Sequence, residues 1–145
     1  MMELSEKEYE ALVELLKDLA DTSKAWATLL ADKYGELIAG IGDIRYSEAV
    51  KIASLASTTF SSMQDLSKAI GEKEELKILA KSGKKFNIVI SPLKGEAFLV
   101  IVTPSSLPIS SLMSKVLDTV ERLAMVLDLV HNKKNEQRKI NSSHF

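Results

Sequence analysis

The segment ELKILAKSGKKFNIVISPLKGEAFLVIVTP, residues 75–104, is the strongest structural signal in this chain. It contains three short runs rich in apolar and β-branched residues: ELKILAKS, KFNIVISPL and EAFLVIVTP. Gly83 and Gly95 lie in the short connections, which are typical of antiparallel hairpins because parallel strands need a long crossover. The last run is apolar at every position from Phe98 to Val102, as in a strand buried on both faces. We therefore expect three consecutive antiparallel strands.

A second hairpin is predicted upstream of this segment. Residues 25–31 are apolar except for Thr28, and residues 36–41 form another short run of strand type. Between them the letters DKYG, residues 32–35, are a turn signal, because Gly35 adopts positive φ angles without steric cost. These patterns predict two more strands, of which the first is covered on both faces.

Three helices complete the predicted order. The first covers residues 5–21, where a capping-box pattern, S-x-x-E, precedes apolar residues at three- and four-residue steps. The second covers residues 47–70 and ends at Gly71, and the third has Pro108 in its first turn and continues to residue 130. The order helix, two strands, helix, three strands, helix predicts an α+β fold. We expect a three-layer sandwich in which a five-stranded antiparallel sheet has helices on both faces.

The length of 145 residues is typical of one domain. We expect that domain to span residues 1–131, and residues 132–145, which are polar and basic, to form a flexible tail. The longest apolar run is far too short to span a bilayer, and the acidic N-terminus lacks the layout of a signal peptide. The chain is therefore predicted to be cytoplasmic and not to insert into a membrane.

Composition and motifs argue against most catalytic and cofactor-binding classes. The formal net charge of −1 provides no overall positive field for nucleic acid, and the absence of cysteine excludes disulfides and thiolate chemistry. Residues 83–85, GKK, are only a fragment of a phosphate-binding loop. The two histidines, His131 and His144, are too isolated to indicate a metal site. We therefore expect no catalytic constellation, no metal and no cofactor.

The predicted second helix has an unusual outward side. Projection at 100° per residue gives a broad apolar side that should pack on the sheet, formed by Ala49, Ile52, Ala53, Leu55, Ala56, Phe60, Met63, Leu66 and Ile70. The other side carries short hydroxyl side chains where a surface helix usually gains from Glu and Lys. A solvated face that happens to use Ser and Thr is one interpretation. The other is an interface for a second copy or a partner, because small side chains let another backbone approach closely. Its candidate residues are Ser54, Ser57, Thr58, Ser61, Ser62 and Asp65.

The ordered elements resemble the roadblock family, the dynein-light-chain-like domains that bind and regulate small GTPases. The resemblance covers about residues 23–130 and is carried by LLADKYGELIAGIG, by the Ala- and Ser-rich helix that leads into DLSKAIGEKEELKILAKSGKKFNIVISPL, and by AFLVIVTPSS. The single positions that match are Asp32, Gly35 and Gly71. The additional N-terminal helix makes the chain more similar to the prokaryotic MglB-type polarity regulators than to the shorter light chains.

This resemblance implies a homodimer, or a heterodimer with another roadblock protein, in which sheets join edge to edge and the second helices lie side by side. It also implies that the paired helices meet a Ras-like small GTPase and alter its GTP/GDP cycle, for example as a GTPase-activating protein. Such regulators reshape the loops of the GTPase rather than inserting an arginine, which agrees with the absence of Arg from the second helix. Arg45 and Arg122 are the alternative arginines.

Two other interpretations remain open. An adaptor of the light-chain or longin type would link larger complexes without changing nucleotide turnover. A PAS- or profilin-like sensor would need a pocket with convergent polar groups inside the sandwich, and the uniformly apolar strands offer few such groups.

Overall fold

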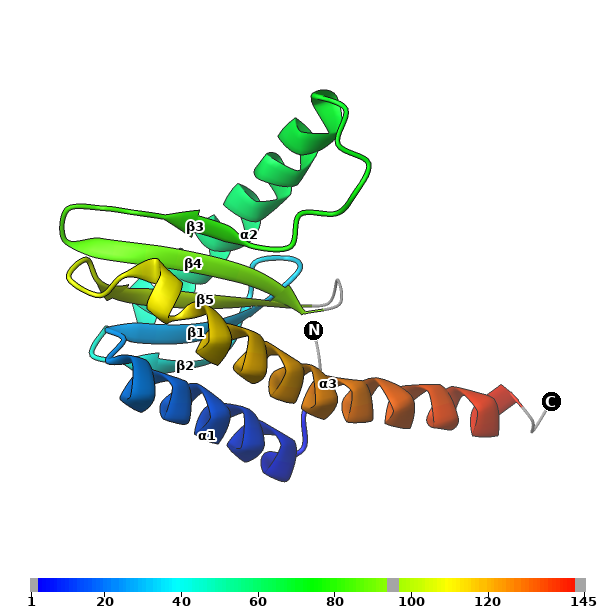
Figure 1. Cartoon of the computed structure of the whole chain (residues 1–145). Helices are drawn as coiled ribbons and strands as arrows, with labels where there is room; N and C mark the ends of the chain where they lie inside the picture. The colour runs from blue at the N-terminus through cyan, green and yellow to red at the C-terminus, as the bar shows by residue number, and fades with distance from the viewer. Residues whose placement is uncertain (1–2, 94–96, 143–145) are drawn as a thin grey trace.

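In the computed structural model, which describes residues 3–93 and 97–142, the elements follow the predicted order (Figure 1). The helices are α1 (Glu6–Ser23), α2 (Tyr46–Ala69) and α3 (Met113–Ser142), and a short 3₁₀ helix, η1 (Ile109–Ser111), precedes α3. The strands are β1 (Ala27–Asp32), β2 (Leu37–Gly42), β3 (Leu79–Lys81), β4 (Phe86–Leu93) and β5 (Ala97–Pro104). They form one antiparallel sheet in the order β2-β1-β5-β4-β3. The predicted fold class is confirmed.

The sheet lies between two helical layers (Figure 1). α1 and α3 cover one face, and α2 crosses the other. Successive residues of β5 point to opposite faces, so Leu99 and Ile101 join the core under α1 and α3, while Phe98 and Val100 join the core under α2. β1 and β5 are thus buried on both faces, as the sequence predicts.

α1 begins at the predicted capping box and is attached to the sheet by apolar and polar contacts. The Ser5 hydroxyl accepts a hydrogen bond from the Glu8 amide at 3.2 Å, and the Glu8 carboxylate accepts one from the Ser5 amide at 3.1 Å. Leu12 and Leu16 are fully buried in the core beneath the helix. Thr28 of β1 donates to the Leu16 carbonyl at 2.9 Å, which joins α1 directly to the sheet.

The edge of the sheet near β3 differs from the prediction. Residues 75–82 were expected to form a strand, but only Leu79–Lys81 pair with β4. Pro92 lies inside β4, beyond the last pair with β3 at Ile90. At that position one side of β4 has no neighbouring strand, which is where a proline without an N–H group is tolerated.

Both ends of α3 also differ from the prediction. Pro108 caps η1 rather than α3, and α3 begins only at Met113. At the other end the helix continues to Ser142 and projects past the sheet (Figure 1), whereas the sequence predicts its end near residue 130. The flexibility of residues 132–145 stays a prediction. The Lys, Glu, Gln and Arg residues of this segment are good helix formers, which accounts for the extension. Residues 143–145 lie outside the described residues, and the domain boundary at 131 stays a prediction.

Within the described ranges, no helix is both long and apolar enough to cross a membrane.

Candidate interaction surface

The buried side of α2 is built for close approach to the sheet. Ala49, Ala53 and Ala56 are buried against it, and their small side chains let the helix axis lie near the strands. Phe60 fills the remaining space and packs on Phe98 of β5, with ring centroids 4.9 Å apart. This alanine-rich contact fixes which side of α2 faces away from the sheet.

α2 ends at the predicted glycine. Gly71 has a φ of +97°, a conformation that residues with a Cβ rarely adopt. The Gly71 amide donates to the Lys68 carbonyl at 3.1 Å, and the Glu72 amide donates to the Ser67 carbonyl at 3.0 Å. These two hydrogen bonds are the Schellman pattern of helix ends.

The β1–β2 turn supports one flank of α2. The Asp32 carboxylate accepts hydrogen bonds from the amides of Tyr34 at 2.8 Å and Glu36 at 2.9 Å, and so fixes the turn. Gly35 has a φ of +86°, and a Cβ at this position would lie 3.2 Å from the Cα of Ser54. Glycine is therefore required at position 35 for two reasons, the positive φ of the turn and the close approach of the turn to α2.

Ser57 lies on this same flank and not on the exposed side. It is only 4% exposed, and its hydroxyl donates to the Lys33 carbonyl at 3.2 Å. The prediction that Ser57 faces outward is wrong, because the β1–β2 turn folds over it.

The other candidate residues are exposed and form what we call the small-residue face of α2: Ser54, Thr58, Ser61, Ser62 and Asp65. The Thr58 hydroxyl donates to the Ser54 carbonyl at 3.1 Å within the helix, so its hydrogen-bonding capacity as a donor is used locally. Because this hydroxyl already donates within its own helix, a partner that covers it would lose less free energy to the removal of water from an unpaired polar group. The role of this face in binding stays a prediction.

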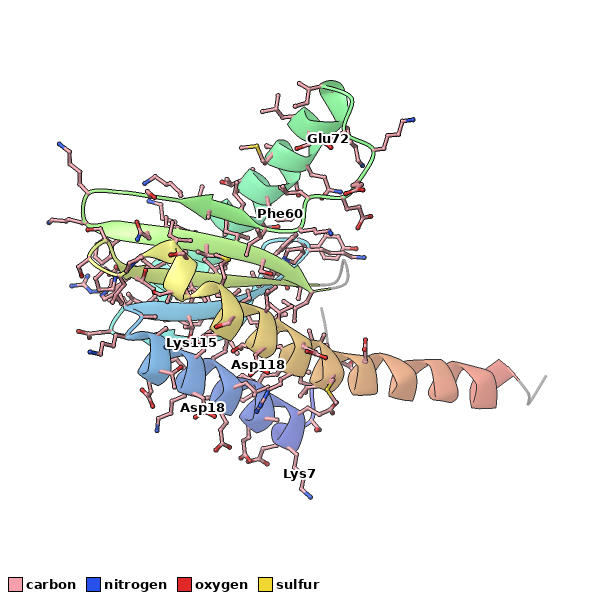
Figure 2. All side chains as sticks on the ribbon, in the orientation of Figure 1. Lys7, Asp18, Phe60, Glu72, Lys115 and Asp118 are labelled. Carbon is pink, nitrogen blue, oxygen red and sulfur yellow. The ribbon has the colours of Figure 1, made fainter. Side chains whose placement is uncertain are left out.

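Three large apolar residues, two on α2 and one at its C-cap, are exposed although the sequence predicted them to be buried. Leu55 is 56% exposed, Leu66 is 55% exposed and Ile70 is 74% exposed. We call these three residues the apolar flank. Figure 2 shows that α2 continues past the sheet between Phe60 and Glu72, so no strand lies beneath its last turns.

The helical projection explains this error. Leu55 and Leu66 lie about 110–130° from the line through Ala49 and Phe60, on the flank opposite Ser57. α2 makes most of its contacts with β1, β2 and β5, and Ile90 of β4 is buried in the same cluster as Phe60. The apolar flank lies on the side of α2 away from the β1–β2 turn. A narrower limit on the buried arc would have placed Leu55 and Leu66 outside it. It would not have identified Ile70, which lies about 70° from the same line and is exposed where α2 has left the sheet.

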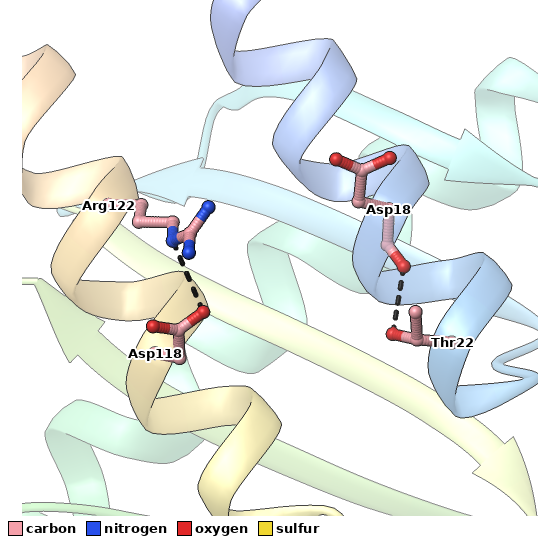
Figure 3. Close-up of polar contacts among 4 residues, drawn as sticks. All are labelled: Asp18, Thr22, Asp118 and Arg122. Carbon is pink, nitrogen blue, oxygen red and sulfur yellow. Dashed lines mark hydrogen bonds and ion pairs between the residues drawn. The ribbon is translucent and has the colours of Figure 1, made fainter.

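The two alternative arginines occupy different sides of the molecule. Arg45 directly precedes α2 and is exposed, with its Nε 3.9 Å from the Glu48 carboxylate. Arg122 lies on α3, on the opposite side of the sheet, where its Nε is 3.2 Å from the Asp118 carboxylate (Figure 3). Of the two, Arg45 is the one that adjoins the α2 surface.

Two kinds of exposed side chain adjoin each other on α2, the small-residue face and the apolar flank. Exposed apolar side chains that lie together, as Leu55 and Leu66 do here, are typical of protein interaction sites. The described part of the chain contains no group of three or more His, Cys, Asp or Glu residues that could hold a metal ion. A shallow hollow of about 370 Å³ lies on the outer side of α1 rather than inside the sandwich, lined by Tyr9, Glu10, Val13, Glu14, Lys17, Asp18 and Asp21.

Comparison with known proteins gives the family. Residues 11–103, more than half of the chain, match the model of the Roadblock/LC7 domain. The chain belongs to the Roadblock/LC7 family. Comparison with curated protein sequences found no match.

Several solved structures share this fold. MglB of Myxococcus xanthus is 20% identical, with a TM-score of 0.80 over 89% of this chain and 96% of that one. The gliding protein MglB of Thermus thermophilus is 22% identical, with a TM-score of 0.77 over 86% of this chain and 94% of that one. A Roadblock/LC7 domain of Streptomyces avermitilis is 15% identical, with a TM-score of 0.74 over 79% of this chain and 96% of that one. The layout is thus similar to that of MglB, and at these identities the likeness concerns the fold.

Proposed function

We propose that this chain is a non-catalytic, cytoplasmic regulator that forms a homodimer through α2 and binds a Ras-like small GTPase. The bound dimer modulates the GTP/GDP cycle of that GTPase. The observation that carries the proposal is the exposed side of α2 in a Roadblock/LC7 domain, where the small-residue face adjoins the apolar flank.

Self-association is supported by the position of the apolar flank. Leu55, Leu66 and Ile70 expose more than half of their surfaces, and burial of apolar surface stabilises by about 25 cal/mol per Å². The flank lies on the side of α2 away from the β1–β2 turn, where a second α2 can pack beside the first. β3 is also a free sheet edge of only three residues, which a second copy can extend.

GTPase binding is supported by what the small-residue face offers. Once two α2 helices are paired through their apolar flanks, the side chains of Thr58 and Ser61 remain on the outer surface of the pair. They give a smooth surface on which another protein can dock closely. α2 contains no arginine, so any effect on hydrolysis comes from repositioning the loops of the GTPase rather than from an inserted guanidinium.

The first test is the mass in solution, measured by light scattering. The wild-type chain is expected to be a dimer, and Leu55→Glu with Leu66→Glu is expected to be a folded monomer. Leu117→Glu with Met125→Glu is the matched control, because these α3 residues are 60% and 63% exposed and lie on the other side of the sheet. A wild-type monomer contradicts the homodimer and favours a heterodimer with another roadblock protein.

The second test measures nucleotide turnover by a Ras-like GTPase from the same organism. Addition of the wild-type chain is expected to change the rate of GTP hydrolysis or of nucleotide exchange. Thr58→Arg with Ser61→Arg is expected to abolish that change and leave the dimer mass unaltered, whereas Leu117→Arg with Met125→Arg has no effect. Binding without any change in turnover would instead favour an adaptor of the light-chain type.

A further inference from the structure

Four connections meet at one end of the sheet, the end at which β1, β4 and α2 begin. They are the α1–β1, β2–α2, β3–β4 and β5–η1 connections. Ser105 joins two of them, since its amide donates to the Lys85 carbonyl at 2.9 Å and its hydroxyl donates to the Lys84 carbonyl at 2.6 Å. Asn87 reinforces the same link by donating to the Leu107 carbonyl at 3.0 Å. These hydrogen bonds hold the β3–β4 and β5–η1 connections together, so the two connections form one continuous surface at this end of the sheet.

Aromatic side chains occupy this surface. The rings of Trp26 and Phe86 pack on each other with centroids 5.3 Å apart and a tilt of 38°. Phe86 is 38% exposed, and Tyr46, in the first turn of α2, is 78% exposed. Trp26 is held in place by its amide, which donates to the Val102 carbonyl at 2.8 Å. The Trp26 and Phe86 rings are thus held against each other at this end of the sheet with part of their surface in water, and Tyr46 adds an exposed ring in the first turn of α2.

Basic residues gather at the same end of the sheet as these rings. All of them are exposed, and they come from three of the four connections and the end of β3: Lys24, Arg45, Lys81, Lys84 and Lys85. The acidic residues at the β2–α2 connection are Asp43 and Glu48, and Glu48 is loosely paired with Arg45. This end of the sheet is therefore locally positive in a chain whose net charge is −1. We call the eight aromatic and basic residues the basic aromatic end.

We propose that the basic aromatic end docks this protein on an anionic lipid bilayer as a peripheral contact. Lysines near a membrane surface are attracted by anionic headgroups, and Trp and Tyr prefer the interface between headgroups and acyl chains. The Trp26 and Phe86 rings cover one another, which leaves fewer free ring faces for stacking with nucleic-acid bases and favours the lipid. The chain needs no spanning helix for such a contact.

This contact is compatible with association through α2. The basic aromatic end lies at the first turn of α2, whereas Leu66 and Ile70 lie at its last turns, roughly 30 Å away along the helix. A dimer held by the apolar flank would carry two basic aromatic ends, and these bind a bilayer more tightly than one end only if the pairing points both toward the same surface. The proposal does not depend on which partner binds the small-residue face.

The test is co-sedimentation of the full chain with lipid vesicles. We expect binding to vesicles that contain phosphatidylglycerol, no binding to vesicles of phosphatidylcholine alone, and loss of binding at high salt. Lys84→Glu with Lys85→Glu is expected to lower the partition coefficient by at least tenfold. Tyr46→Ser, which leaves the charge unchanged, is expected to lower it severalfold.

The matched control is Lys7→Glu with Lys17→Glu, which makes the same change of charge on exposed positions of α1. This variant is expected to bind like the wild type. Failure of the wild type to bind phosphatidylglycerol vesicles at low salt would overturn the proposal. So would an equal loss of binding in the α1 control, because the attraction would then follow total charge. Binding to an oligonucleotide or to polyglutamate without binding to vesicles would also overturn it and reassign the surface to an anionic polymer.

Discussion

Gly35 and Gly71 both have positive φ angles, but their surroundings differ. Alanine substitutions at the two positions therefore distinguish the cost of backbone strain from the cost of a steric clash. A Cβ at Gly71 meets nothing within 4 Å, whereas a Cβ at Gly35 lies 3.2 Å from the Ser54 Cα. Gly71→Ala is expected to lower the free energy of unfolding by about 1 kcal/mol through strain alone. Gly35→Ala causes the same strain and in addition places the new Cβ against α2, which must shift. We therefore expect it to lower the free energy of unfolding by about 2–3 kcal/mol. Urea unfolding of both variants measures the difference, and equal losses would show that the Gly35 contact relaxes freely.

Asp32 holds the same turn through two hydrogen bonds to one carboxylate oxygen, from the amides of Tyr34 and Glu36. Asp32→Ala leaves both amides without this acceptor and is expected to lower the free energy of unfolding by about 2 kcal/mol. Asp32→Asn keeps an oxygen at the same position and is the control, with an expected loss below about 1 kcal/mol. Thermal or urea unfolding gives both values. If Asn were as damaging as Ala, the charge and not the oxygen would be the stabilising feature.

At the scale of elements, the extension of α3 is the part of the fold that the core needs least. The helix continues to Ser142, but Figure 1 shows its last turns projecting past the sheet and α1. Removal of residues 132–145 is therefore expected to change the free energy of unfolding by less than about 0.5 kcal/mol. Circular dichroism would show the loss of helical signal, and urea unfolding would show the unchanged stability. A marked loss of stability would mean that the domain does not end near residue 131.

Element order and type were predictable because periodicity and turn chemistry are local. The DKYG turn, the capping box at Ser5 and the fully apolar run of β5 all formed where the sequence placed them. Exposure on α2 was less predictable, because it depends on where the helix leaves the sheet. Ser57 is covered by a turn that is distant in sequence, and Ile70 lies where α2 has already left the sheet (Figure 2), so neither environment follows from the helix alone. The basic aromatic end was missed for the same reason, since its residues come from separate connections.

At the scale of the whole molecule, the exposed apolar flank couples folding to association. A protein that dimerises only when folded becomes more stable as its concentration rises, because mass action favours the associated state. The urea midpoint of the wild-type chain is therefore expected to increase over a hundredfold range of protein concentration. Leu55→Glu with Leu66→Glu should remove this dependence.

The same experiment distinguishes a specific interface from general stickiness. Leu117 and Met125 are as exposed as the apolar flank but lie on α3, across the sheet from α2. If Leu117→Glu with Met125→Glu keeps the concentration dependence and the α2 variant loses it, the two folded copies meet through α2. If both variants lose it, exposed apolar surface in general holds the copies together. A wild-type midpoint that is independent of concentration would mean that the apolar flank does not bind a second copy of this chain. Another roadblock protein would then be the expected partner of the apolar flank, in a heterodimer.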